Sequence, residues 1–273
     1  MLPERLRAWL ARYRLGRVFM LMFDMLEAHR APTAAGAMAF DAFLSLVPLA
    51  AFAGYLLHLL REDYALVLRP LLNTAPEPVR QLVDAEFLRL SDAGATIVAP
   101  VSIAAFLWVS SAGISTAMGV FESMFHSPER PWYIRRLIAM GAVVASFIGL
   151  IVVVTVAVLV AKLWGSFGAA LLAALVPPVV VIGLLCGFFR IAIRGPRPLR
   201  RRVLPGAVVT LVLWTATSAV FSLYVARLSR YATLYGSLAA AAIFMFWLWL
   251  LALILLVGGE VNAQLEGVRE GEP

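Results

Sequence analysis

The sequence predicts an all-α, polytopic membrane protein with six transmembrane helices and an amphipathic N-terminal helix. Of its 273 residues, 62% are hydrophobic and only 14% are charged, whereas a soluble domain is nearer half apolar and a quarter charged. Apolar runs of roughly 20 residues, the length that crosses the hydrocarbon core, recur along the chain. Basic residues gather between certain of these runs. An ordinary soluble fold is therefore excluded.

The N-terminal segment, residues 1–32, precedes the first predicted span. Residues 3–29 carry apolar side chains at near-helical spacing, with arginines in the gaps. Such a helix can lie on the inner membrane surface, where arginine meets lipid phosphate, or it can pack against the transmembrane bundle. The sequence leaves both arrangements open. It shows no small-residue cleavage site here, so we expect no cleaved signal peptide.

One transmembrane domain, residues 33–262, is predicted to follow, with a short tail at 263–273. Its sizeable outer loop, 61–94, contains a segment at 76–90 whose apolar residues share one helical face, which predicts a short amphipathic helix. Each span meets the length that hydrocarbon requires. The six predicted spans are 33–60, 97–121, 137–161, 168–189, 203–225 and 237–259.

Lysine and arginine residues predict the orientation, because cytoplasmic loops carry an excess of them. With six spans, the N-terminal segment, the 126–136 loop and the 190–202 segment fall on one side. This places both termini on the cytoplasmic side of the plasma (inner) membrane. It also explains much of the net charge of +7 without a nucleic-acid partner. We expect anionic lipid headgroups as partners of the arginines on this side: Arg130, Arg135, Arg136, Arg200, Arg201 and Arg202.

Residues that could perform catalysis or bind a metal are sparse. The single cysteine, Cys186, excludes a disulfide within the chain and a cysteine-based metal cluster. The three histidines are far apart, and no metal-ligand spacing or phosphate-binding glycine loop is present. We therefore expect no catalytic residues, no metal, no cofactor and no enzymatic activity, ribonuclease activity included.

Asp41 is an acid inside the first predicted span. An intramembrane carboxylate costs several kcal/mol unless it is paired, hydrated or protonated. It is either a proton-coupling, cation-coupling or substrate-binding group, or a structural partner of a basic residue such as Arg190 or of a serine or tyrosine hydroxyl. Further polar residues extend a candidate pathway, although the serines also suit close helix packing. Glu260 also suits an inter-helix ion pair, for which we expect an arginine from one of the cytoplasmic clusters as the partner. The pathway residues are Ser45, Ser110, Ser111, Ser115, Glu260 and Asn262.

Three prolines are candidate helix breaks. Pro48 lies mid-way along the first predicted span, and Pro177 and Pro178 lie mid-way along the fourth. Each removes a backbone donor from its helix. Breaks at matching positions of two inverted halves are typical of transporters with a site near the midplane. Two ordinary proline kinks are the alternative.

Several motifs resemble those of the YihY/BrkB family of bacterial inner-membrane proteins. They include "GAMAFDAFLSLVP" (36–48), "LWVSSAG" (107–113), "ERPWYIRR" (129–136), "LPGAVVTLVLW" (204–214) and "FWLWLLALILLVGGEVNAQLE" (246–266). The resemblance implies a multi-span inner-membrane protein. Members of the family have been labelled as a ribonuclease or a virulence factor, and some have been linked to export or lipid handling. Asp41 departs from the family pattern, so the resemblance implies no role for it.

Two functions remain open from the sequence. The first is a transporter or permease-like protein whose substrate is lipid-like or amphiphilic. The second is a non-transporting membrane scaffold that supports envelope assembly. A cavity lined by Asp41, the Ser110–Ser115 face and Glu260 would favour transport, whereas a bundle packed solid at mid-depth would favour the scaffold.

Overall fold

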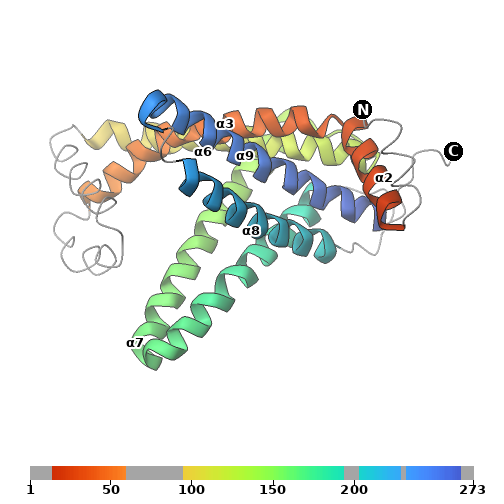
Figure 1. Cartoon of the computed structure of the whole chain (residues 1–273). Coiled ribbons are helices and arrows are strands. Elements are labelled where there is room, and N and C mark those ends of the chain that lie inside the picture. The colour runs from red at the N-terminus through yellow and green to blue at the C-terminus, as the bar shows by residue number, and fades with distance from the viewer. Residues whose placement is uncertain (1–13, 60–94, 194–202, 229–231, 266–273) are drawn as a thin grey trace. The chain divides into compact units, whose positions relative to one another are not determined.

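The structure is a computed structural model that describes residues 14–59, 95–193, 203–228 and 232–265 (Figure 1). Within these ranges the secondary structure is helical and contains no strand, which confirms the predicted all-α class. The N-terminal helix predicted at 3–29 is present from residue 14 onward. The helices are α2 (Arg14–Ala28), α3 (Ala31–Leu59), α6 (Ala95–Met124), α7 (Trp132–Ala192), α8 (Val203–Leu228) and α9 (Ala232–Leu265).

Six described segments are long and apolar enough to cross a membrane, which confirms the predicted number of spans. Each overlaps one of the predicted ranges. The first begins at Ala31, immediately after Arg30, which adopts a positive φ of 52° between α2 and α3. The segments are Ala31–Ala51, Pro100–Met124, Trp132–Val153, Leu175–Ala192, Val203–Tyr224 and Ala241–Leu265.

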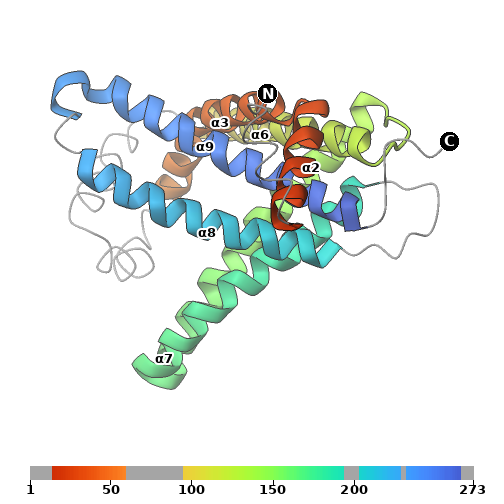
Figure 2. The same cartoon turned by 45° about the vertical axis from the view of Figure 1, so that its right-hand side comes forward.

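Helix α7 contains two of these spans and reverses direction between them. A Cβ added to Gly149 would lie 2.8 Å from Cδ1 of Leu184 and 3.3 Å from Cγ1 of Val180. In a straight helix these residues would stand about 50 Å apart at 1.5 Å per residue. The chain therefore turns back between Gly149 and Val180. Figures 1 and 2 show the resulting two antiparallel arms of α7 side by side.

The chain divides into two compact units, residues 1–41 with 111–273 and residues 42–110. In the first unit, α8 packs along α9, α7 packs against α8, and α2 packs against α9 (Figure 2). Its fully buried apolar side chains include Met118, Phe121, Phe189 and Leu256. In the second unit, Ser45, Ser102 and Phe106 are buried.

The contact between α2 and α9 bears on the two arrangements left open for the N-terminal segment. Leu26 packs against the apolar core of the first unit, while Leu21 is 55% exposed. For residues 14–28, the structure therefore places an amphipathic helix on the bundle. Residues 1–13 lie outside the described residues.

Helices α3 and α7 continue past their internal prolines, Pro48 in α3 and Pro177 and Pro178 in α7. The idea of two broken helices in inverted halves therefore stays a hypothesis. Other predictions fall outside the described residues: the outer loop 61–94 with its helix at 76–90, the arginines at 200–202, and the tail from 266 onward.

Candidate functional site

Helix termini from distant parts of the sequence meet at one end of the first unit. Arg130, just before α7, binds the carbonyls at the C-terminal end of the same helix. Asn262 of α9 binds the first turn of α8, and His29 beside α2 faces Glu260 of α9. This gathering agrees with the prediction that the basic segments lie on one side. We call it the basic end, defined by residues 26–31, 121–136, 189–193, 203–206 and 259–264.

Glu122 is a fully buried carboxylate at the basic end. Its side chain is 0% exposed, and its Oε2 lies 3.2 Å from Nη1 of Arg135. Nη1 of Arg130 lies 3.8 Å from Oε1. A buried ion pair offsets its desolvation cost only when the remaining donors and acceptors are also satisfied. One carboxylate here faces two guanidinium groups, so this group of three side chains carries a net positive charge.

Arg130 joins the loop before α7 to the far end of the same helix. It donates from Nη2 to the carbonyl of Ile191 at 2.6 Å and from Nη1 to the carbonyl of Ala192 at 3.0 Å. The last carbonyls of a helix have no partner within the helix. The guanidinium satisfies two of them and complements the negative end of the helix dipole. Arg130 thereby fixes the two arms of α7 together at the basic end.

Glu260 is the second buried carboxylate, 1% exposed near the end of α9. Its Oε2 lies 3.4 Å from Nδ1 of His29, and its Oε1 accepts a hydrogen bond of 2.8 Å from Gln264. The sequence predicts a cationic partner from an arginine cluster, but the structure places a histidine there. His29 follows α2, so this contact helps to hold α2 on α9.

Helices α8 and α9 approach each other at two glycines. A Cβ on Gly206 would collide with the carbonyl of Gly258, and a Cβ on Gly258 would collide with Oγ1 of Thr210. Small residues allow such close approach of membrane helices. Asn262 completes the junction, because its Oδ1 accepts a hydrogen bond of 2.8 Å from the Gly206 N–H. Asn262 thereby links α9 to the first turn of α8.

The carboxylates Glu122 and Glu260 flank one further contact. A Cβ on Gly259 of α9 would collide with the ring of Phe121 in α6. In the sequence, Glu122 directly follows Phe121 and Glu260 directly follows Gly259. Each is nearly inaccessible, Glu122 lies next to the guanidinium of Arg135, and Glu260 lies next to the imidazole of His29. Within the described residues, no group of three His, Cys, Asp or Glu side chains could hold a metal ion.

Asp41 is half-buried on α3, at the edge of the first unit. Arg136 of α7 lies close enough for its charge to act on Asp41, and pairing of Asp41 with Arg190 stays a prediction. On α6, Gly113 leaves room for this part of α3, since an added Cβ would lie 3.6 Å from the Asp41 Cβ. A charge interaction fits the structural alternative for Asp41, and its coupling role stays a prediction.

The other pathway residues divide between the two units. In the second unit, Ser45 donates to the carbonyl of Ala42 at 2.6 Å, and Oγ of Ser110 is buried with no hydrogen-bond partner among the described residues. The first unit holds Ser111, which is buried, and Ser115, which is half-buried, besides Glu260 and Asn262. A shared polar pathway through these residues therefore stays a prediction.

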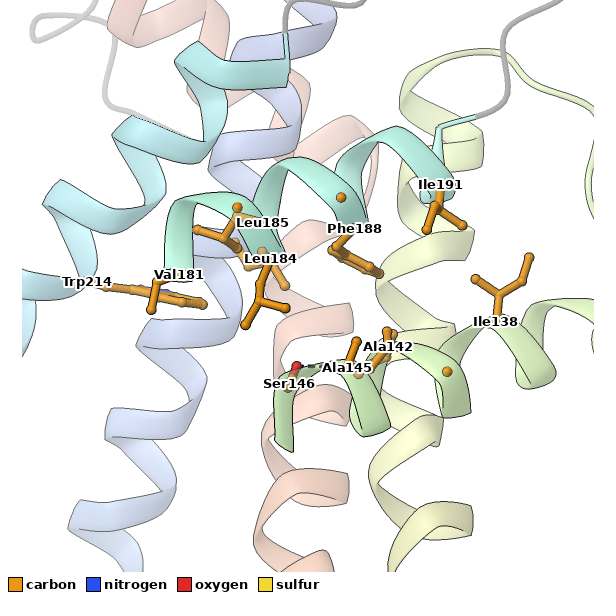
Figure 3. A pocket seen from close by; sticks show the side chains of 15 residues that line it. Ile138, Ala142, Ala145, Ser146, Val181, Leu184, Leu185, Phe188, Ile191 and Trp214 are labelled. Carbon is orange, nitrogen blue, oxygen red and sulfur yellow. Dashed lines mark hydrogen bonds between the residues drawn. The ribbon is translucent and has the colours of Figure 1, made fainter. Parts of the chain in front are cut away.

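A cavity of about 690 Å³ lies within the first unit, between the two arms of α7 and parts of α6, α8 and α9 (Figure 3). Its polar groups are already bound: Ser146 donates to the carbonyl of Ala142 at 2.9 Å, and Trp214 Nε1 donates to the carbonyl of Leu251 at 2.8 Å. The lining is therefore apolar. It consists of Ile114, Ile138, Gly141, Ala142, Ala145, Ser146, Val181, Gly183, Leu184, Leu185, Gly187, Phe188, Ile191, Trp214 and Leu255.

This cavity includes none of the predicted pathway residues, and sequence reasoning missed it. Glu122 was missed as well. The signal for Glu122 was available, since it is an acid at the end of an apolar span, a few residues before Arg130 and Arg135. The cavity has a weaker signal, the glycines at 183 and 187, which leave one face of α7 without side chains.

These observations define the class of protein: a six-span α-helical membrane protein with buried ion pairs at one end and an apolar cavity among its helices. The family model described as "Virulence factor BrkB" matches residues 22–273, nearly the whole chain. The chain belongs to this family, which confirms the resemblance predicted from its motifs.

Relatives of known sequence agree with the membrane class. A UPF0761 membrane protein of Aromatoleum aromaticum is 26% identical over 93% of this chain and 65% of its own length. The ribonuclease-like protein YfkH of Bacillus subtilis is 34% identical over 33% of this chain and 32% of its own length. The match thus spans less than two thirds of either relative. No solved structure matches the chain.

Proposed function

We propose that the protein is transporter-like and acts on a lipid-like or amphiphilic substrate in the plasma (inner) membrane. The observation that carries this proposal is the apolar cavity of about 690 Å³ between the arms of α7. Its volume lies within the range of small-molecule sites, roughly 300–1,000 Å³. Because cytoplasmic loops carry an excess of lysine and arginine, the basic end and both termini are assigned to the cytoplasmic side.

The chemistry of the lining supports an apolar ligand group. A hydrophilic solute needs hydrogen-bonding partners to replace its water. Ser146 and Trp214, the lining residues with polar side-chain atoms, already donate to backbone carbonyls. A hydrocarbon tail requires no such partner, and it is the part of an amphiphile that this cavity suits.

Neither alternative function accounts for the cavity. A scaffold needs only a surface that binds its partners, so filling the space between the α7 arms would not impair a scaffold function. Hydrolytic nucleases need an acid/base pair or a metal in a water-accessible cleft. Glu122 is buried beside Arg135 and Glu260 is buried beside His29, so neither acid is open to water, and the ribonuclease-like name of YfkH is not extended to this chain.

The test is to fill the cavity. Added Cβ atoms at Gly183 and Gly187 would meet nothing within 4 Å, so leucine at either position meets no obstacle at its Cβ and extends into the cavity that both glycines line. The matched control is Ala219→Leu, on an exposed face of α8 outside the cavity lining. The full chain is reconstituted in liposomes, and flux of fluorescently labelled phospholipid is measured with and without a pH gradient.

We expect flux in the native protein and in the control, and loss of most of it in Gly183→Leu and Gly187→Leu. The same liposomes carry a diazirine-acyl phospholipid, which is photolysed to label the cavity. Absence of labelling on both arms of α7 would refute the proposal. Flux that survives both leucine substitutions would refute it as well.

A further inference from the structure

We propose that the cavity takes up an acyl chain and that Trp214 sets the greatest chain length it accepts. This deepens the proposed function and rests on it, because it assigns the selection of substrate in the same cavity to one residue. The proposal depends on the length of the cavity, on the direction in which an amphiphile lies in it, and on the fixed position of the Trp214 ring.

The cavity extends along the two arms of α7. Its lining runs from Ile138 to Ser146 on the first arm and from Val181 to Ile191 on the second. At 1.5 Å per residue these stretches cover about 12 Å and about 15 Å. The hydrocarbon core of a membrane is about 30 Å thick, so the acyl chains of one leaflet occupy about 15 Å. The cavity therefore matches an acyl chain of ordinary membrane length that lies along the arms.

The two ends of the cavity differ in their surroundings. Ile138 and Ile191 lie at one end, and Trp214 lies at the other (Figure 3). The end with the isoleucines adjoins the basic end, and the exposed rings of Trp132 and Tyr133 precede Ile138 within two helical turns. Exposed tryptophan and tyrosine at the end of a span are typical of the headgroup level of a membrane. The polar head of an amphiphile stays at this end, so its chain points toward Trp214.

The ring of Trp214 is held in place at the far end. Its Nε1 donates to the carbonyl of Leu251 in α9 at 2.8 Å, and the half-buried side chain packs against the apolar core of the first unit. Indole has one donor and no acceptor. Turning the ring away would leave this donor without a partner in apolar surroundings, which is costly. The ring is therefore a fixed wall, and a longer chain must bend or withdraw.

The lining around this wall suits a terminal methyl group. Val181 is the lining residue of the second arm farthest from the basic end, and its side chain is apolar. Ser146 is its counterpart on the first arm, and its hydroxyl already donates to the carbonyl of Ala142 at 2.9 Å. A methyl group needs no hydrogen bond, so this end selects by length and not by polar recognition.

The experiment uses three phosphatidylcholine probes with a lauroyl, palmitoyl or behenoyl chain, each with a diazirine at its terminal carbon. The full chain is reconstituted in vesicles that contain one probe at a time, photolysed, and mapped by mass spectrometry. We expect the palmitoyl probe to label Val181 or Trp214 and the lauroyl probe to label lining residues nearer Ile138. Forcing extra methylene groups against a fixed wall resembles overpacking, so behenoyl labelling of the lining should be weaker than palmitoyl labelling by about fivefold or more.

Two substitutions should shift the accepted length in opposite directions. Trp214→Ala removes the wall, so behenoyl labelling should rise toward palmitoyl labelling. Val181→Phe fills the same end, so the lauroyl probe should become the most strongly bound of the three. This second variant keeps the indole and its hydrogen bond, and it tests the proposal even where Trp214→Ala fails to fold.

The matched control is Trp249→Ala. Trp249 also donates from Nε1 to a backbone carbonyl, that of Pro32 at 3.1 Å, but it does not line the cavity. The control therefore loses the same side chain and the same kind of hydrogen bond. Its preference for chain length should equal that of the native protein.

The outcomes separate this inference from the proposed function. If no probe labels the lining of the α7 arms, the proposed function fails and this inference fails with it. Equal labelling by palmitoyl and behenoyl probes in the native protein overturns the length limit and leaves the cavity as an acyl-chain site. An unchanged preference in folded Trp214→Ala or in Val181→Phe overturns the assignment to this end, and so does an equal shift in Trp249→Ala.

Discussion

Gly258→Ala tests the close contact between α8 and α9 directly. The added Cβ would collide with Oγ1 of Thr210 and lie 2.8 Å from the carbonyl oxygen of Gly206 and 3.3 Å from Cζ of Phe189. A threonine hydroxyl can rotate away, but its hydrogen bond to the Gly206 carbonyl, 2.8 Å long, would then be lost. The carbonyl itself belongs to the helix backbone and can move only if α8 moves.

The expected cost follows from two opposing terms. Overpacking a tight core typically costs about 1–3 kcal/mol. Replacing glycine by alanine inside a helix returns about 0.5–1 kcal/mol through reduced backbone entropy. The collision therefore dominates, and we expect Gly258→Ala to lower the free energy of unfolding by about 1–2 kcal/mol.

The matched control is Gly187→Ala. Gly187 also lies inside a membrane-spanning helix, but an added Cβ there meets nothing within 4 Å. Only the effect of reduced backbone entropy applies at this position, so the free energy of unfolding should stay equal or rise by up to about 1 kcal/mol. Both variants are unfolded in mixed micelles of increasing SDS content, and tryptophan fluorescence reports the folded fraction.

A Gly258→Ala protein as stable as the native one would refute the close contact. A second variant, Gly258→Ala with Thr210→Ala, locates the obstacle. The backbone carbonyl of Gly206 remains in the way after the hydroxyl is removed, so we expect only partial recovery. Full recovery would show that Thr210 alone limits the approach of the helices.

Three further predictions concern single contacts. Asn262→Ala should lower the free energy of unfolding by about 1 kcal/mol in the same SDS titration, because the Gly206 N–H loses its acceptor; an unchanged midpoint would contradict this capping role. Glu260→Gln should weaken the attachment of α2 by removing the ion pair with His29, which is measured as faster trypsin cleavage at Arg30, and an unaltered cleavage rate would count against it. Asp41→Asn should abolish any dependence of lipid flux on the pH gradient, and a variant with native dependence would exclude proton coupling at this position.

Hydrophobic length explains why the spans were predictable. A span must satisfy its backbone polar groups internally and be apolar along about 20 residues, and both requirements are visible locally. The excess of lysine and arginine in cytoplasmic loops then predicted that three segments lie on the same side of the membrane: the N-terminal segment, the 126–136 loop and the segment near Arg190. The contacts of Arg130 with Ile191 and Ala192 bring two of these segments together.

The ion pairs were not predictable to the same degree, because they depend on which helices become neighbours. Glu260 clearly required a cation, but nothing local distinguishes His29 from the arginines of three basic segments. Similarly, the sequence suggested a partner for Asp41 on the fourth span and gave no reason to name Arg136, near the start of the third, whose charge also acts on Asp41. The cavity depends on the angle between the α7 arms, which no local sequence pattern specifies.

The distribution of polar contacts bears on the route by which the lipid tail of the proposed function would reach the cavity. At the basic end, Arg130 ties the two arms of α7 together through two carbonyls and also lies 3.8 Å from Glu122 of α6. Asn262 and paired glycines close the α8–α9 junction. Farther along α7 the arms face each other through apolar side chains and the glycines at 141, 183 and 187, without inter-arm hydrogen bonds among the described side chains. Separating the arms there breaks no ion pair, whereas separating them at the basic end exposes Glu122. Under the proposed function, entry from the side, between the arms at membrane depth, would therefore cost less than entry past Arg130.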